Sequence, residues 1–195
     1  MIHDKAVEFD PENNKLTTKG GETITYDYLI VAAGLALDYG AIKGLDGVGF
    51  SSESNDEVSQ KIGKNGVHSI YYANGAEKTW DGIQELISEA KKGKKLKALF
   101  THPNTSIKCG GAPKKIMYLT NARLKEAGVR DNVEMTFLPN GGNMFGVKEY
   151  HDAIVKQFEA RDMKWEYKHN LVEIDVDAKK ATFEKKWEEK GPWDA

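Results

Sequence analysis

The sequence predicts an α/β fold in which helices cover a parallel sheet and a small antiparallel meander is appended. Over residues 77–184, segments with helical spacing alternate with short apolar segments. Strands that are separated by helices need crossovers, so they are expected to run parallel. Residues 1–45 instead contain short extended segments between tight turns, which is the pattern of an antiparallel meander.

The meander is expected at the start of the chain. Strands are predicted over residues 6–9 and 15–18, with a turn at 11–14 and another at Gly20-Gly21. An alternating segment then leads into Leu29-Ile30-Val31-Ala32-Ala33, and Gly34 ends it. A continuous apolar run of this length predicts a strand that is buried on both faces.

Three helices are predicted after the meander, because apolar residues recur at every third or fourth position. Their marker residues are, in chain order, Trp80, Ile83, Ile87 and Ala90; Ala112, Ile116 and Leu119; and Val147, Tyr150, Ile154, Val155 and Phe158. Strands are predicted over residues 96–101, 133–138, 165–167, 171–176 and 181–183. The last three are expected to form the small antiparallel cluster.

We therefore expect four segments. Residues 1–45 form a partial meander with a buried strand, and 46–76 form a connection. Residues 77–184 form the parallel domain, and 185–195 are a polar end. The net charge of -2 gives no basic patch for nucleic acid. The longest apolar run, residues 28–37, is too short to span a bilayer.

The chain contains one cysteine, Cys109. One cysteine excludes an intramolecular disulfide and every multi-thiolate zinc site. The five histidines lack ligand spacing, so no metal site is expected. Cys109 is therefore either a small buried hydrophobic residue or a reactive thiol.

The residues around Cys109 favour the reactive thiol. The segment 101–113 joins a predicted strand to the next helix, and ligands of parallel sheets bind at such carboxyl ends. It lacks the G-x-G-x-x-G spacing of a dinucleotide site, so NAD(P) binding is not expected. Nearby positive charges and a helix start opened by Pro113 favour a thiolate. The lysines concerned are Lys108, Lys114 and Lys115. His102 is either a base or a structural side chain at the strand end.

The segment 104–119, which contains Lys108-Cys109-Gly110-Gly111-Ala112-Pro113-Lys114-Lys115, resembles the active-site segment of sulfide:quinone oxidoreductases, most closely the mitochondrial type. The resemblance continues at residues 77–80, 145–148 and 168–173. Residues 26–34 are similar to the second flavin-domain motif, which two-domain flavoproteins share widely.

This resemblance implies a Rossmann-like, NAD(P)-domain-like sheet after a partial FAD-domain meander. It implies that sulfide attacks a disulfide or trisulfide made by two cysteines. One cysteine becomes a persulfide, and the other, matched by Cys109, passes electrons to FAD and then to quinone. Lys115 matches a lysine near the flavin and quinone, and His102 is a further catalytic candidate. The implied cofactor-binding residues are Ala33, Gly34, Gly110, Gly111, Ala112 and Pro113. Ala33 stands where the family usually has threonine.

The implied partners are sulfide, a quinone, a sulfur acceptor and a second copy in a homodimer, at the periphery of a membrane. No first-strand G-x-G-x-x-G and no second cysteine occur in the sequence. We therefore expect an internal fragment that is soluble, binds little or no FAD and is inactive alone. Two other functions stay open. One is an NAD(P)H-dependent disulfide or quinone reductase, and the other is a flavin-free persulfide carrier.

Overall fold

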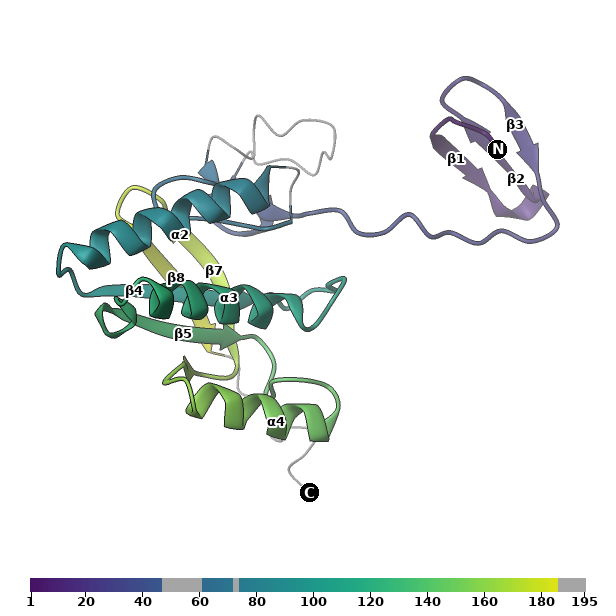
Figure 1. Cartoon of the computed structure of the whole chain (residues 1–195). Helices are drawn as coiled ribbons and strands as arrows, with labels where there is room; N and C mark the ends of the chain where they lie inside the picture. Colours follow the sequence, from purple (N-terminus) through teal and green to yellow (C-terminus); the bar gives the residue numbers. More distant parts are fainter. Residues whose placement is uncertain (47–60, 72–73, 186–195) are drawn as a thin grey trace. The chain divides into compact units, whose positions relative to one another are not determined.

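The computed structural model describes residues 1–46, 61–71 and 74–185, which divide into two compact units, Met1–Gly34 and Leu35–Ala195. Much of the predicted connection 46–76 and nearly all of the polar end 185–195 lie outside the described residues. The first unit is the predicted meander, an antiparallel sheet of order β1-β2-β3 (Figure 1). Its strands are β1 (Ala6–Asp10), β2 (Lys15–Thr18) and β3 (Thr23–Thr25), and a 3-10 turn, η1 (Pro11–Asn13), joins the first two.

The predicted buried strand over residues 29–33 is wrong for this structure. The segment forms no strand, and the side chains of Tyr28 and Ile30 are 93% and 89% exposed. A strand buried on both faces needs paired neighbours and covering layers. No described strand pairs with this segment, so its apolar side chains have nothing to pack against.

The second unit contains the predicted parallel sheet, of order β4-β5-β6. The three predicted helices are confirmed. The elements in chain order are η2 (Tyr39–Ala41), α2 (Gly75–Lys91), β4 (Leu96–His102), α3 (Ala112–Glu126), η3 (Arg130–Asn132), β5 (Val133–Pro139), α4 (Lys148–Glu159), β6 (Lys164–Trp165), β7 (His169–Asp175) and β8 (Lys180–Lys185).

The antiparallel cluster differs from the prediction in one strand. Among the described strands, β7 and β8 form it, as a two-stranded hairpin. β6 instead pairs in parallel with β5, with Thr136 opposite Lys164 and Phe137 opposite Trp165. The crossover helix α4 precedes β6, so β6 runs in the direction of β5 and extends the same sheet.

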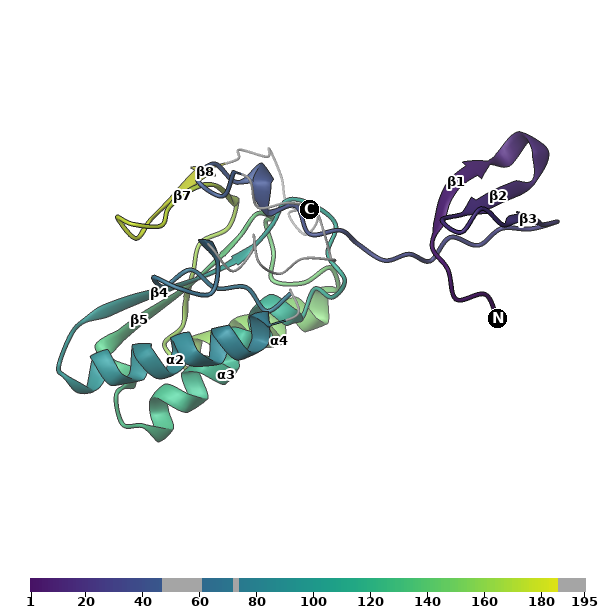
Figure 2. The same cartoon turned by 90° about the horizontal axis from the view of Figure 1, so that it is seen from above.

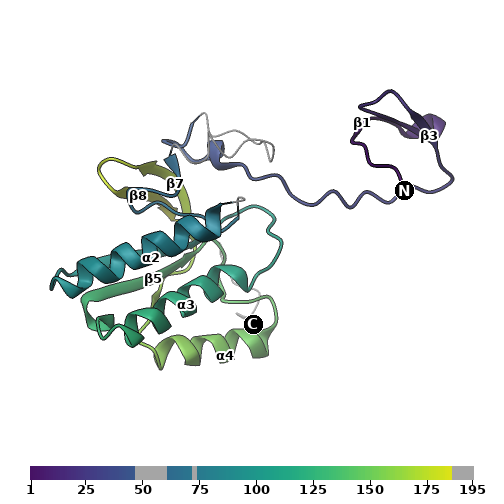
Figure 3. The same cartoon turned by 45° about the horizontal axis from the view of Figure 1, so that its top comes forward.

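The helices and the hairpin lie on opposite sides of the parallel sheet (Figures 2 and 3). The crossover from β4 through α3 to β5 and the crossover from β5 through α4 to β6 move along the sheet in the same direction. Because such crossovers are right-handed, α3 and α4 lie on the same face of the sheet. The core lies between this face and the helices. Its largest buried side chains include Phe137 of β5, Phe158 of α4 and Met117 of α3.

The buried face of α3 is not the predicted one. Leu119 is 52% exposed, whereas Lys114, Met117, Asn121 and Leu124 are buried. These four residues are three or four positions apart, so they share one face of the helix. The prediction followed the apolar residues alone and thus missed a buried stripe that contains two polar side chains.

Candidate active site

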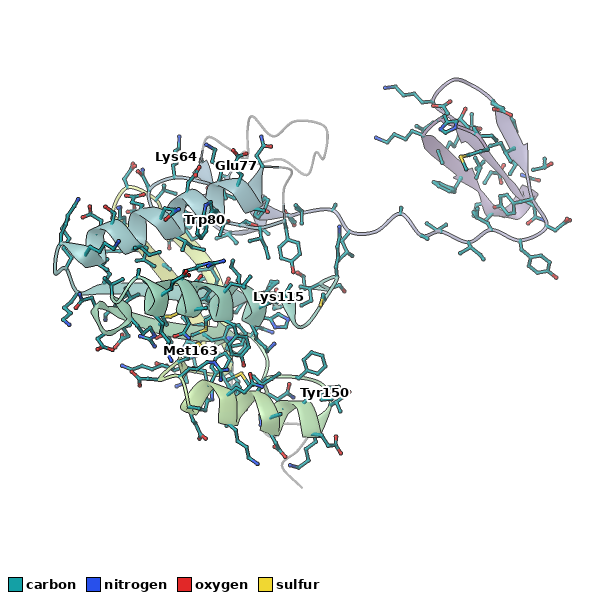
Figure 4. The ribbon with its side chains drawn as sticks, in the orientation of Figure 1. Lys64, Glu77, Trp80, Lys115, Tyr150 and Met163 are labelled. Carbon is teal, nitrogen blue, oxygen red and sulfur yellow. The ribbon has the colours of Figure 1, made fainter. Side chains whose placement is uncertain are left out.

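The candidate site lies where β4 and β5 end. The two strands pair in register from Leu96 opposite Val133 to His102 opposite Pro139, so both terminate at the same level. The chain leaves β4 through residues 103–111 and enters α3 at Ala112. In Figure 4, Lys115 of α3 and Tyr150 of α4 mark the helix ends on this side of the sheet. This is the edge at which parallel α/β sheets bind their ligands.

Cys109 is exposed at the end of this loop. The interpretation of Cys109 as a small buried hydrophobic residue is therefore wrong. Its carbonyl oxygen accepts a hydrogen bond from the amide of Ala112, 3.2 Å away, so its backbone is tied to the first turn of α3. A Cβ atom added to Gly111 would lie 3.6 Å from the Cys109 Sγ atom. The glycine thus leaves one side of the sulfur free of side-chain atoms.

Lys114 is the buried cation of the site. Its side chain is only 2% exposed, and its Nζ atom donates a hydrogen bond of 2.8 Å to the Gly110 carbonyl oxygen. The ammonium group also lies 5.1 Å from the centre of the Phe137 ring and 5.8 Å from that of Phe145. Burial lowers the pKa of Lys114 to about 8, against a smaller upward effect of the nearby Cys109 charge.

A pocket of about 360 Å³ opens beside this lysine. It lies between the loop after β4 and the loop after β5, and Gly110 and Lys114 form part of its wall. The remaining lining residues are His102, Pro103, Asn104, Thr105, Pro139, Asn140, Gly141, Asn143, Met144, Phe145 and Gly146.

Two titratable side chains face Cys109 or Lys114. The pKa of His102 is lowered, first by burial and then by the positive charge of Lys114. The pKa of Tyr71 is raised, first by burial and then by the charge of Cys109. The Tyr71 hydroxyl is buried and has no hydrogen-bond partner among the described residues. The fold therefore brings Tyr71, which the sequence analysis did not single out, close to the cysteine.

The other predicted site residues fall into two groups. Lys115 is exposed in the first turn of α3, where its amide donates a hydrogen bond of 2.9 Å to the Gly111 carbonyl oxygen. Ala112 and Pro113 open the same helix, so they adjoin Cys109. Ala33 and Gly34 belong to the other unit, and the structure does not relate them to this loop. Gly34 has φ +81°, a backbone conformation that favours glycine.

The spacing of residues in α3 contains a signal that Lys114 is buried, although its charge alone predicts only a nearby positive group. Lys114 precedes Met117 by three residues and Asn121 by seven, which places it on the buried face of α3. Nothing in the local sequence indicated Asn140 or Tyr71, because both reach the site through tertiary packing. Among the described residues, no group of three His, Cys, Asp or Glu side chains is arranged to hold a metal ion.

Sequence comparison links the chain to curated proteins from several eukaryotes. It is 42% identical over 183 residues to a protein of Mus musculus named sulfide:quinone oxidoreductase, mitochondrial, and 40% identical to a protein of the same name from Dictyostelium discoideum. Each alignment covers 94% of this chain and 36% of the relative. The chain thus spans about a third of the length of these relatives. No family model matches it.

Structural comparison finds the same type of fold in a crystal structure of the sulfide:quinone oxidoreductase from Aquifex aeolicus. The TM-score is 0.62, and the match covers 93% of this chain and 39% of that chain. The sequence identity is 21%, so this likeness supports the fold alone. The mixed α/β architecture agrees with the prediction from the sequence.

Proposed function

We propose that this chain is part of a sulfide:quinone oxidoreductase and that Cys109 is one of the two cysteines that oxidise sulfide. The observation that carries the proposal is the position of this thiol. Cys109 is exposed at the carboxyl edge of a parallel sheet and is followed by two residues without side chains. A structural cysteine would be buried among apolar side chains instead.

The chemistry is a thiol–disulfide exchange with a second cysteine. The 195-residue sequence contains Cys109 alone, so another segment of polypeptide must supply that cysteine. Hydrosulfide attacks the disulfide between that cysteine and Cys109, and the S–S bond breaks. A new S–S bond forms on the second cysteine as a persulfide. The Cys109 sulfur leaves as a thiolate that carries the electron pair, and the proton of hydrosulfide goes to solvent or to a base. When bound, FAD would supply the two-electron acceptor that passes this pair to a quinone.

The residues around Cys109 suit a flat cofactor at this edge. Gly110 and Gly111 present bare backbone, and Ala112 and Pro113 open α3 beside them. Unpaired amides and the positive end of the helix dipole favour negative charge there. We propose that these four residues contact the cofactor. Ala33 and Gly34, in the first unit, are proposed as cofactor contacts on the resemblance of their own segment alone. We also propose that the exposed cation of Lys115 lies toward the flavin and quinone.

His102 is the candidate base of this proposal. Its lowered pKa leaves the imidazole neutral at neutral pH, so a ring nitrogen is available to accept a proton. In the whole protein we place the reaction at a membrane surface, because quinones dissolve in the bilayer. None of the described helices is long and apolar enough to cross one.

The test is the reactivity of the Cys109 thiol, which the proposal needs as one half of a disulfide; polysulfide is the probe, because a reactive thiolate takes up one sulfur atom from it. The chain is incubated with inorganic polysulfide, alkylated and examined by peptide mass spectrometry. We expect one added sulfur atom on the Cys109 peptide of the wild type and none in Cys109→Ser. An unmodified Cys109 under conditions that modify a free cysteine peptide would refute the proposal.

Flavin titration distinguishes the alternatives. FAD that gains a resolved visible spectrum on binding supports the flavin-linked oxidoreductase. A flavin-free persulfide carrier is favoured if Cys109 forms a stable persulfide and FAD binds neither to this chain nor to a longer protein that contains it. A spectral response to NADH favours the reductase instead.

A further inference from the structure

We propose that the pocket between the loops after β4 and β5 binds a small anion, with Lys114 as its charged ligand. Cys109 is not among the residues that line the pocket, although its charge acts on Lys114. The proposal does not depend on bound flavin or on turnover. It rests on charge, burial and an incomplete hydrogen-bond network.

The first observation is a buried charge without a counter-charge. Lys114 is 2% exposed, and no carboxylate pairs with it among the described residues. Its hydrogen bond to the Gly110 carbonyl and its contacts with two aromatic rings offset only part of the desolvation cost. A buried ammonium group has three donors, and this arrangement leaves room for a negatively charged partner.

The second observation is the chemistry of the pocket wall. Of the described residues that line it, none is acidic. The wall offers one buried cation, the His102 imidazole, the side-chain amides of Asn104, Asn140 and Asn143, and the hydroxyl of Thr105. A wall of donors around a cation selects for anions, since an anion pairs with the charge and accepts from the donors.

The third observation is an unsatisfied polar atom. The Oδ1 atom of Asn140 is buried and has no hydrogen-bond partner in the described structure. Buried polar groups are nearly always paired in folded proteins. This oxygen is an acceptor, so a bound anion cannot pair with it directly. A water molecule that enters the pocket with the anion would donate to both.

The pocket also limits the size of the ligand. Its volume of about 360 Å³ is near the lower end for small-molecule sites. Met144 and Phe145 add apolar surface next to the polar groups, and Tyr150 packs against Phe145 with ring centres 5.7 Å apart. The fitting class is a small oxyanion or carboxylate.

The test is a chemical-shift titration of the 195-residue chain carrying Cys109→Ser, which removes thiol reactions. Sodium sulfate and sodium acetate are the probes, against sodium chloride at matched ionic strength to correct for screening at exposed lysines. We expect saturable shifts at the amides of Gly110 and of residues 140–146. Saturation by sulfate alone identifies a tetrahedral oxyanion, and saturation by acetate alone identifies a carboxylate.

Matched variants assign the site to the buried cation. Lys114→Met should weaken binding at least about 10-fold, whereas Lys115→Met removes a neighbouring exposed lysine and should leave it unchanged. If Lys114→Met fails to fold, Lys114→Gln takes its place. Absence of saturation with either probe overturns the proposal, and so does equal binding by the Lys114 variants.

The pH dependence gives an independent readout. Lys114 is charged below its pKa of about 8, so affinity should fall as the pH rises through that value. The groups that face Lys114 electrostatically are His102 and Cys109, and Cys109→Ser removes the second. A bound anion should also raise the titration midpoint seen at the Lys114 Cε resonance. A midpoint that does not move with saturating probe contradicts a direct contact.

Discussion

At the scale of single residues, the Lys114 ammonium group and the Cys109 thiol differ in exposure. The lysine is held against the Gly110 carbonyl oxygen inside the fold, while the thiol is exposed. They are only five positions apart in the sequence, yet they take opposite environments because the loop ends at Gly111 and the helix begins at Ala112. This arrangement places a buried cation and an exposed thiol in one short segment.

The lowered pKa of Lys114 predicts how stability depends on pH. The unfolded chain keeps this lysine charged up to its ordinary pKa of 10.5, whereas the folded chain loses the proton near pH 8. Between these values the unfolded state binds more protons, so the free energy of unfolding rises with pH. For a pKa shift of this size, the free energy of unfolding changes by about 3 kcal/mol across the whole interval.

Chemical denaturation of the wild type and of Lys114→Met, from about pH 7 to about pH 10, measures this effect without oxyanions in the buffer. We expect the wild type to gain stability relative to the variant over that interval. Parallel pH profiles for the two proteins would show that Lys114 is not desolvated in the fold. Lys115→Met is the control, because its side chain is exposed.

At the scale of elements, the segment before α2 is anchored to β7. Lys43 forms a parallel bridge with Glu173, its amide donates to the Val172 carbonyl oxygen, and the amide of Ile174 donates to the Lys43 carbonyl oxygen. Leu45 and Ile62 are buried in a second small cluster that Ile174 also contacts.

Gly44 is a position at which an added side chain would disturb this anchor. It has φ +89°, and an added Cβ atom would lie 1.9 Å from the carbonyl oxygen of Ile174. Gly44→Ala must therefore move the backbone of one of the two segments, and we expect a loss of about 3 kcal/mol or more in the free energy of unfolding.

Gly93→Ala is a matched control for this substitution. Gly93 has φ +82° but nothing within 4 Å of an added Cβ atom, so only the backbone strain remains. That strain is worth about 1–2 kcal/mol. Equal losses for the two variants in urea unfolding would show that the close approach to Ile174 does not exist in solution.

At the scale of the whole molecule, the chain contains two units with different amounts of core. The Leu35–Ala195 unit has a continuous apolar core between one sheet face and three helices. The Met1–Gly34 unit is a three-stranded meander, and the apolar segment that ends it is exposed. Such a segment is typical of a strand that pairs with elements other than the ones described.

The exposure of this segment predicts that a charged substitution in it has little effect on stability. Replacement of Ile30 by Lys should change the free energy of unfolding by less than about 0.5 kcal/mol, since Ile30 is 89% exposed. Ile174→Lys, which places a charge beside the Leu45–Ile62 cluster, is the destabilising comparison. A large loss for Ile30→Lys in thermal unfolding would mean that residues 29–33 do form a buried strand.

Much of the fold could be predicted from the sequence. The meander strands, the three helices, the parallel strands and the loop that contains Cys109 all follow from local periodicity and turn residues. These signals depend on neighbours within one turn or one hairpin. The assignment of β6 failed because a strand of two residues has almost no periodicity, and its sheet is chosen by the direction in which α4 returns the chain.

Local sequence by itself determined that a cysteine stands between positive charge and two glycines at a strand-to-helix loop. Only the tertiary structure decided that Cys109 is exposed, that Lys114 is buried, and that residues 140–146 complete a pocket beside them. Burial depends on what other segments cover, and Phe137, Phe145 and Asn140 come to this loop from β5 and the loop that follows it. The sequence shows that a lysine carries a charge, but packing decides whether that charge is buried, where it can bind a ligand, or solvated.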